Sequence, residues 1–486
     1  MYDHNKQYRC DIIRGKSQSL MDDLLSAYAK VIDEICPCAH DLFEDKYNEA
    51  FARYLPEDNR VKKTFDNHRT EISGKLFGMY YFADDGVVYE SERTQKYLFD
   101  NDQPAFFKDV CYKMQFPNGM QKTSPTVIER VRDGICIRPN AFLLRFLQIA
   151  KTANVGVTKK MIGYYILNSL DVLTGVATPY EVLETLAYDI NHGISRQIHA
   201  IDENGNEKAD SYKYQHINEQ LNYLELANLI RFVDNPAGNN DRIIILNPLE
   251  EPAIDLFASK WDTKPSFDVA SFDLTTVEKR KSFQYAWDEY YARISDVSSH
   301  FNTDVNALAF TAEQQERGKD FGGQDEKADQ INLVAFGDEG EALVFEYEKK
   351  RVAAYNTRLA NKVLSLGKTK GLGYDIQSVI AEPGEMDEFV KYIEVKSTKR
   401  LTCPSTSDNL WIDTLNITRN EWIAARQHGA FYSIYRVYFT RSGVSAFILS
   451  NVASKMDDGR MQTTPMTYRV DFSNSSIDST IELQLA

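Results

Sequence analysis

The pattern of apolar and polar positions divides the chain into a long helical part and a shorter part rich in strands. A first helix is predicted from apolar residues at helical spacing, namely Leu20, Leu24, Tyr28, Val31 and Ile35. Pro37 ends that helix, and residues 19–150 are predicted to be mostly helical, with a looser aromatic-rich segment over 76–116. This N-terminal region, 1–156, is interpreted as a DNA-recognition region.

Residues 157–255 have the pattern of a winged helix-turn-helix module. Its predicted helices cover 160–172, the segment that begins at N-cap Thr178 with Pro179 in the first position, and the segment that carries Ile217, Leu221 and Leu224. Strands at 229–233 and 242–245 flank a turn and are predicted to pair as the wing. The third helix would present polar side chains to DNA: Lys213, Gln215, His216, Asn218, Gln220 and Asn222. A protein-binding role for this module is the alternative.

Residues 256–330 are predicted to be a connector. The segment 277–310 is expected to be helical, and the polar stretch 311–330, which contains Gly322-Gly323, is expected to be a linker. The last region, 331–486, is predicted to run helix, strand, strand, helix, strand. Its strands are expected at 374–379, 390–395 and 431–438. A capping box at Thr418-Arg419-Asn420-Glu421 should open the second helix, and Gly429 should end it.

Acids and a lysine on two of these strands form the set that a metal-dependent phosphodiesterase needs. Asp375 lies on one strand, and Glu394 and Lys396 alternate on the next, so both of the latter face one cleft. Two carboxylates can hold a hard divalent cation, and a lysine can offset charge at the attacked phosphate. Glu341, at the start of the first C-terminal helix, is a third acid. A structural ion pair with Lys396 is the alternative, but it would leave excess negative charge.

This arrangement resembles the PD-(D/E)XK nuclease superfamily, the fold of many restriction endonucleases, over roughly the last 150 residues. Four motifs resemble the nuclease-like domain named for the plant protein NO VEIN: Gly340-Glu341, Gly373-Tyr374-Asp375-Ile376, Ile393-Glu394-Val395-Lys396-Ser397 and Asn420-Glu421-Trp422. The chain departs from the superfamily in lacking a proline before Asp375. The N-terminal 330 residues resemble no known family, but their pairing with such a domain resembles restriction enzymes that have a separate recognition region.

The resemblance implies that Asp375, Glu394 and the backbone carbonyl of Val395 bind Mg²⁺, which Mn²⁺ can replace. It implies that Lys396 orients the attacking water or stabilises the transition state, and that Glu341 contacts a metal-bound water or a second cation. Further residues are expected around the cleft, with Gln377 lining it and Lys399 and Arg400 holding the backbone of the cut strand.

Charge and composition refine this picture only locally. The net charge is −15, yet residues 116–162 hold eight Lys or Arg against two acids. That surplus predicts a DNA-facing surface that includes Arg130, Arg132, Arg138, Lys159 and Lys160, and a solvated helix face is the alternative. The absence of a secretory signal or a membrane-length apolar stretch, together with six scattered cysteines, predicts a cytoplasmic protein with reduced thiols.

Together these observations predict a fold of mostly α-helical N-terminal regions followed by an α/β nuclease domain. The predicted function is that of a Mg²⁺-dependent endonuclease of the type II restriction kind. It would cut double-stranded DNA at a sequence or a modified base, in defence against phage and other foreign DNA. A homodimer on DNA and a methyltransferase encoded nearby are the expected partners. The alternatives are a DNA-binding or regulatory protein that does not cut, and a nuclease selective for RNA or for structure.

Overall fold

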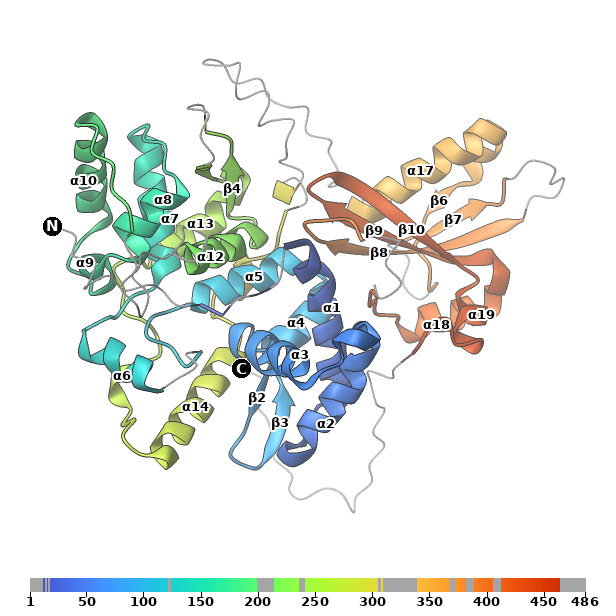
Figure 1. Cartoon of the computed structure of the whole chain (residues 1–486). Helices are drawn as coiled ribbons and strands as arrows, with labels where there is room; N and C mark the ends of the chain where they lie inside the picture. The colour runs from blue at the N-terminus through green and yellow to red at the C-terminus, as the bar shows by residue number, and fades with distance from the viewer. Residues whose placement is uncertain are drawn as a thin grey trace, which may run out of the picture.

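The structure is a computed structural model of the chain, shown in Figure 1. It describes residues 12–13, 15, 18–120, 124–198, 214–235, 241–304, 307–308, 339–367, 372–381, 389–404 and 412–463. The predicted linker 311–330 and the residues Lys122 and Lys213 lie outside these ranges. The described part is a mixed α and β protein with three β-sheets. None of its helices is both long enough and apolar enough to cross a membrane.

Helices dominate the first 152 residues. Their bounds are α1 Gln18–Ile35, α2 His40–Phe51, α3 Lys62–Asp66, α4 Glu92–Asp100, α5 Gln103–Lys113, α6 Ser124–Arg132 and α7 Pro139–Thr152. The first helix therefore ends two residues before Pro37, as predicted. The segment 76–116 is more regular than expected, because it holds α4, α5 and two strands. A small antiparallel sheet has the order β1-β3-β2 and is formed by Cys38–Ala39, Val87–Glu90 and Tyr80–Phe82.

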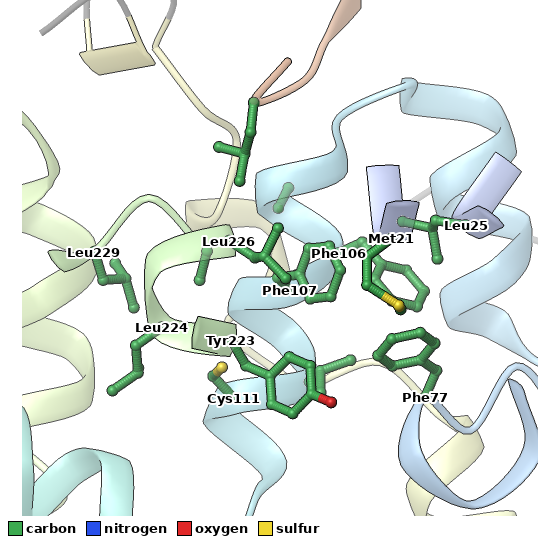
Figure 2. Close-up of a cluster of buried hydrophobic side chains, with 14 of the residues drawn as sticks. Met21, Leu25, Phe77, Phe106, Phe107, Cys111, Tyr223, Leu224, Leu226 and Leu229 are labelled. Atoms are coloured by element: carbon green, nitrogen blue, oxygen red, sulfur yellow. The ribbon is translucent and has the colours of Figure 1, made fainter. Parts of the chain in front are cut away.

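The core of this part lies where α1, α5 and α12 (Gln215–Leu226) meet (Figure 2). Met21 and Leu25 come from α1, and Phe106 and Phe107 come from α5. The ring of Phe77 meets those of Phe106 and Phe107 edge to face, each with centroids 5.6 Å apart. Edge-to-face pairs satisfy the quadrupoles of the rings, so this aromatic cluster fixes the helices relative to one another.

The predicted helix-turn-helix elements are largely present as secondary structure. Their bounds are α10 Pro179–Asn191, α12 Gln215–Leu226, β4 Ile230–Val233 and β5 Ile243–Leu246. The strands β4 and β5 pair antiparallel, and Thr178 caps α10 with Pro179 at its start. The predicted helix 160–172 is wrong as one piece. It consists of α8 Lys159–Ile162, a π-helical turn Gly163–Leu167 and α9 Leu170–Leu173.

The predicted connector helix 277–310 is too long. After α13 (Glu251–Ala258), helix α14 covers Val277–Ala292, and an irregular segment with one short 3₁₀ turn follows. Beyond Ala292, side chains of the N-terminal region accept hydrogen bonds from the backbone N–H groups. The N–H of Ile294 donates to Glu92 Oε2 at 3.1 Å, and that of Ser295 donates to Asp109 Oδ1 at 2.8 Å. Tertiary hydrogen bonds thus replace the helical ones here.

The C-terminal region is built on a five-stranded sheet of order β10-β9-β8-β7-β6. The bounds of its elements are α17 Glu339–Tyr355, β6 Leu364–Ser365, β7 Ile376–Val379, β8 Val390–Lys399, α18 Arg419–His428, β9 Tyr432–Thr440, β10 Gly443–Ser450 and α19 Val452–Asp457. Strands β8 and β9 are parallel, and the other pairs are antiparallel. Figure 1 shows α17 on one side of the sheet and α18 with α19 on the other. The helix and strand predictions are confirmed here, while β6, β10 and α19 were not expected.

The sheet is docked on the N-terminal region through the end of α4. Asn101, which follows α4, accepts hydrogen bonds on its backbone carbonyl from Thr398 Oγ1 and from the backbone N–H of Lys399, each at 3.0 Å. A second contact joins Arg441, after β9, to Glu225 of α12, with 3.4 Å between Nη1 and Oε1. The far end of β8 is therefore held by a helix from the other half of the chain.

Candidate active site

A pocket of about 480 Å³ opens where the two halves of the chain meet. Its lining combines the predicted site residues Glu341, Asp375, Glu394, Val395, Lys396 and Lys399 with Phe99, Asp100 and Asn101 from the end of α4. Of the described residues that line it, five are Asp or Glu and three are Lys or Arg. The pocket is thus richer in negative than in positive charge.

Antiparallel pairing of β7 with β8 brings Asp375 beside the Glu-x-Lys segment. The register places Ile376 opposite Ile393, and the N–H of Asp375 donates to the carbonyl of Ile393 at 2.9 Å. The Asp375 carboxylate then accepts the backbone N–H of Val395 at 2.8 Å. Alternation along β8 points Ile393 and Val395 toward α17 and points Glu394 and Lys396 to the opposite face.

Lys396 lies between two carboxylates, and only one of them was predicted as a site residue. Its Nζ is 2.8 Å from Glu394 Oε1 and 2.8 Å from Glu421 Oε2. Glu421 belongs to the first turn of α18, where it closes the predicted capping box with Thr418. In the sequence, the capping box alone explained the presence of Glu421 at this position, so nothing marked it as a site residue. Its second contact depends on how α18 packs against β8, which no local pattern encodes.

Burial and the charges of neighbouring side chains shift the pKa values of Glu394 and Lys396. Burial, and next the nearby Asp375 carboxylate, together raise the pKa of Glu394 to about 8. Burial alone would lower the pKa of Lys396, but Glu394 and Glu421 outweigh it and leave the pKa raised. The site therefore keeps Lys396 charged and disfavours ionisation of Glu394.

Glu341 approaches the same pocket from α17. A side chain on Gly367 would place its Cβ 2.2 Å from Glu341 Oε2, so this glycine leaves room for the carboxylate. In the part of the chain that the structure describes, no three His, Cys, Asp or Glu side chains form a preassembled metal centre. The donors nevertheless suit a hard cation, because they are oxygen atoms. Burial and the nearby Asp375 raise the pKa of Glu394, so its ionised carboxylate is costly without a counter-ion, and a cation would lower that cost.

The remaining predicted cleft residues differ in position. Lys399 lines the pocket, and its Nζ is 3.8 Å from Asp102 Oδ2. Gln377 is half-buried on β7, and Arg400 is buried after β8, but neither is part of the pocket lining. Arg436 was not anticipated. It lines the pocket from β9 and donates from Nε to Asp413 Oδ2 at 2.6 Å.

The end of α4 adds the features of the pocket that are least visible in the sequence. Phe99 is 81% exposed at the pocket, although aromatic side chains are usually covered. Asn101 adopts a left-handed conformation with φ of 51°, and its Oδ1 accepts a hydrogen bond from Arg436 Nη2 at 3.1 Å. The N-terminal region thus supplies one wall of the pocket, including Asp100, while the predicted catalytic acids Glu341, Asp375 and Glu394 come from the C-terminal region.

The predicted DNA-binding residues of the N-terminal half remain predictions. Gln215, Asn218 and Asn222 are half-buried on α12, and Lys160 is exposed at the start of α8, next to the half-buried Lys159. Arg132 is exposed, with 3.3 Å between its Nε and Asp133 Oδ1. Two other members of the basic segment contact the protein itself, one buried and one half-buried. Arg130 is buried, and Arg138 bonds to Ser266 with its guanidinium 5.8 Å from the ring centroid of Tyr112.

Comparison with known proteins identifies the N-terminal half. A family model described as the N-terminal part of the restriction endonuclease BpuJI matches residues 2–288, more than half of the chain. The chain belongs to that family. A solved structure of the BpuJ1 endonuclease binding domain, in complex with pyrene- and phenanthrene-modified DNA, is 46% identical. The matched region covers 60% of this chain and 100% of the chain of the solved structure, and the TM-score is 0.55. The expectation that this region resembles no family is therefore corrected.

A second family model, described as the C-terminal part of the protein NO VEIN, matches residues 340–449. The resemblance to that domain is confirmed over β6–β10 and the helices α17 and α18. Among curated proteins, no relative matches the chain. The two matches together indicate a restriction-endonuclease-like protein with a DNA-binding or nuclease function.

Proposed function

We propose that the protein is a Mg²⁺-dependent endonuclease that cuts double-stranded DNA at a sequence or a modified base. In this proposal the BpuJI-family region and its winged helix-turn-helix elements recognise the DNA, and a PD-(D/E)XK domain over residues 331–486 cuts it. The proposal is based on the pocket of about 480 Å³ between the two halves of the chain, which we call the junction pocket. There Asp375, Glu394 and Lys396 meet beside a helix end of the recognition region.

Three features of the described residues support cutting rather than binding alone. A module that only binds DNA needs basic side chains, yet this pocket has more carboxylates than basic groups, and two of the nearby carboxylates contact Lys396. The pKa of Glu394, raised to about 8, is typical of functional sites, where desolvation and like charges are brought together. The pocket is also open to solvent beside the exposed ring of Phe99, so a DNA strand can reach it.

Each side chain receives a role from its position. Asp375, Glu394 and the carbonyl of Val395 would hold the cation, and Glu341 would contact its outer ligands. A bound Mg²⁺ ion would neutralise charge on the phosphate and activate water as a nucleophile. Lys396 would place its ammonium against the phosphate and stabilise the charge that develops during cleavage. Lys399 would bind the backbone of the cut strand.

A cleavage assay with matched variants tests this proposal. Plasmid and phage DNA incubated with the wild-type protein and Mg²⁺ should give discrete fragments. Asp375→Ala and Lys396→Ala should each slow cleavage about 100- to 1,000-fold or more, because each removes a group that acts on the phosphate. DNA retention in a gel-shift assay should stay near the wild-type level. Glu346→Ala, which removes an exposed acid from α17, is the control and should cut normally.

The pattern of products separates the competing functions. A smear would indicate a nuclease without site choice, and binding without cleavage would indicate a regulatory protein. Cleavage of RNA in preference to DNA would favour the RNA-directed alternative. Loss of both cutting and retention in Asp375→Ala would show that the carboxylate stabilises the fold rather than the reaction.

A further inference from the structure

We propose that Glu421 is a positioning residue for the reaction, holding the ammonium group of Lys396 in the pocket when Glu394 engages a cation. This inference rests on the proposed nuclease function and deepens it. It assigns to the helix α18 a part in the active site beyond covering the sheet.

The geometry makes Glu421 an equal partner of Lys396. The lysine Nζ lies 2.8 Å from the carboxylates of both Glu394 and Glu421. The side chains of Glu394 and Glu421 are only 5% and 12% exposed, so both ion pairs are shielded from water. If Glu394 shares its charge with a cation, its hold on the lysine weakens. Glu421 then becomes the group that keeps the flexible lysine chain oriented toward the pocket.

The fold brings Glu421 to this place through a close contact at Gly373. Gly373 has φ of +76°, and a Cβ on it would lie 2.4 Å from the carbonyl oxygen of Asn420. Only glycine therefore allows the first turn of α18 to rest against the chain just before Asp375. Tyr432 Oη donates to the Gly373 carbonyl at 3.0 Å and locks the same contact from β9. The residue after Asn420 is Glu421, so its carboxylate is delivered beside Lys396.

A second capping box in the same chain shows what capping alone requires. Thr178 and Glu181 form it at the start of α10, where Glu181 Oε2 accepts the N–H of Thr178 at 2.8 Å. In α18, Glu421 Oε2 accepts the N–H of Thr418 at 3.1 Å. Glu181 is exposed to solvent, whereas Glu421 is buried and also binds Lys396. Capping does not demand burial of the carboxylate, so the burial of Glu421 reflects its second contact.

Glu421→Gln tests the proposal because glutamine keeps an acceptor for the cap but loses the charge that holds Lys396. The single-turnover cleavage rate of the full-length protein with Mg²⁺ should fall about 10- to 100-fold, as expected for a misplaced catalytic group. The melting temperature and the dissociation constant for DNA should change little. Glu181→Gln makes the same change at the α10 box and should leave the cleavage rate unchanged.

Thr418→Ala separates capping from positioning in the opposite sense. It removes the side-chain cap of α18 but keeps the ion pair, so it should lower the melting temperature while costing less cleavage than Glu421→Gln. Glu421→Asp, which keeps the charge on a shorter chain, should restore part of the rate lost in Glu421→Gln.

The outcomes distinguish this inference from the function on which it rests. Wild-type cutting with an unchanged rate in Glu421→Gln would overturn the inference and leave the nuclease function intact. The inference would also be overturned if Glu421→Gln lost stability and DNA binding in proportion to its loss of cleavage rate, and if Thr418→Ala lost as much rate. Failure of the wild-type protein to cut any DNA would overturn both.

Discussion

The N-terminal region and the junction pocket treat buried charge in different ways. In the part of the chain that matches the BpuJI N-terminal family, residues 2–288, Arg93 Nε lies 2.7 Å from Asp109 Oδ2, and Lys108 Nζ lies 2.8 Å from Glu250 Oε2. These pairs have side chains no more than 6% exposed, and each joins one cation to one anion. The described lining of the junction pocket instead has five acids and three basic residues.

This difference is what we expect between charges that organise the fold and charges that bind a ligand. A buried ion is costly unless a partner compensates it, so one-to-one pairs such as Arg93 with Asp109 are consistent with a structural role. A surplus of negative side chains in a solvent-reached pocket keeps this energetic cost unless a ligand of opposite charge binds there.

Breaking a matched pair should damage folding. Asp109→Ala removes the partner of Arg93 and also an acceptor of the Ser295 N–H, which bonds to Asp109 Oδ1 at 2.8 Å. The free energy of unfolding should fall by about 3–5 kcal/mol, because a buried guanidinium is left without its counter-ion. Chemical denaturation followed by circular dichroism measures this loss. Glu289→Ala, which breaks an exposed pair with Arg293, is the control and should cost under about 1 kcal/mol.

Removing a charge from the surplus should instead stabilise the protein, and the gain should depend on pH. The folded-state pKa of Glu394 is about 8, above the value of roughly 4.3 for an unfolded chain. The fold therefore favours the protonated acid, and that stability is present below about pH 4 and lost as the pH rises through about 8. Glu394→Gln does not titrate, so without metal it should exceed the wild type by on the order of 2 kcal/mol at pH 9 and match it at low pH.

Thermal unfolding of both proteins from pH 5 to pH 9, with and without Mg²⁺, measures this effect. Magnesium should raise the wild-type melting temperature most at high pH and should affect Glu394→Gln less. Parallel pH curves for the two proteins would mean that Glu394 carries no unrelieved charge.

The contact between the two regions should contribute a smaller effect. Asn101→Ala removes the acceptor of Arg436 and places alanine in the left-handed region, while both bonds to its backbone carbonyl remain. The expected cost is about 1–3 kcal/mol. Asn154→Ala is a matched control, because Asn154 also has a left-handed φ of 54° but lies on an exposed turn after α7. If both variants lose equal stability, the Arg436 bond adds nothing.

The sequence predicted those parts of the site that depend on local pattern. Alternation along 390–395 placed Glu394 and Lys396 on one face, and the capping-box spacing located the start of α18. It did not predict the parts that depend on packing between distant segments. Phe99 and Asn101 reach the pocket only because α4 docks on β8, and Glu421 reaches Lys396 only because Gly373 admits α18.

The same limit explains the errors in the fold. Apolar spacing over 160–172 suits one helix, but a Cβ on Gly163 would lie 2.6 Å from Ile217 Cδ1 of α12, and this close packing accompanies the π-helical turn. Likewise, α14 stops where Glu92 and Asp109 capture backbone amides. The basic surface over 116–162 was predicted only by counting charged residues, and in the structure Arg130 of this segment is buried. The sequence therefore showed which residues carry charge, but not which of them face solvent.

The most direct measurement of the central claim is a crystal structure of the full-length protein grown with Mn²⁺, with anomalous diffraction recorded at a wavelength where manganese scatters strongly. The proposed function predicts an anomalous peak in the junction pocket, from manganese bound by the carboxylates of Asp375 and Glu394, and the loss of that peak in Asp375→Ala. A pocket without manganese, or manganese bound elsewhere while Glu394 keeps only its contact with Lys396, would show that these carboxylates do not form a metal site.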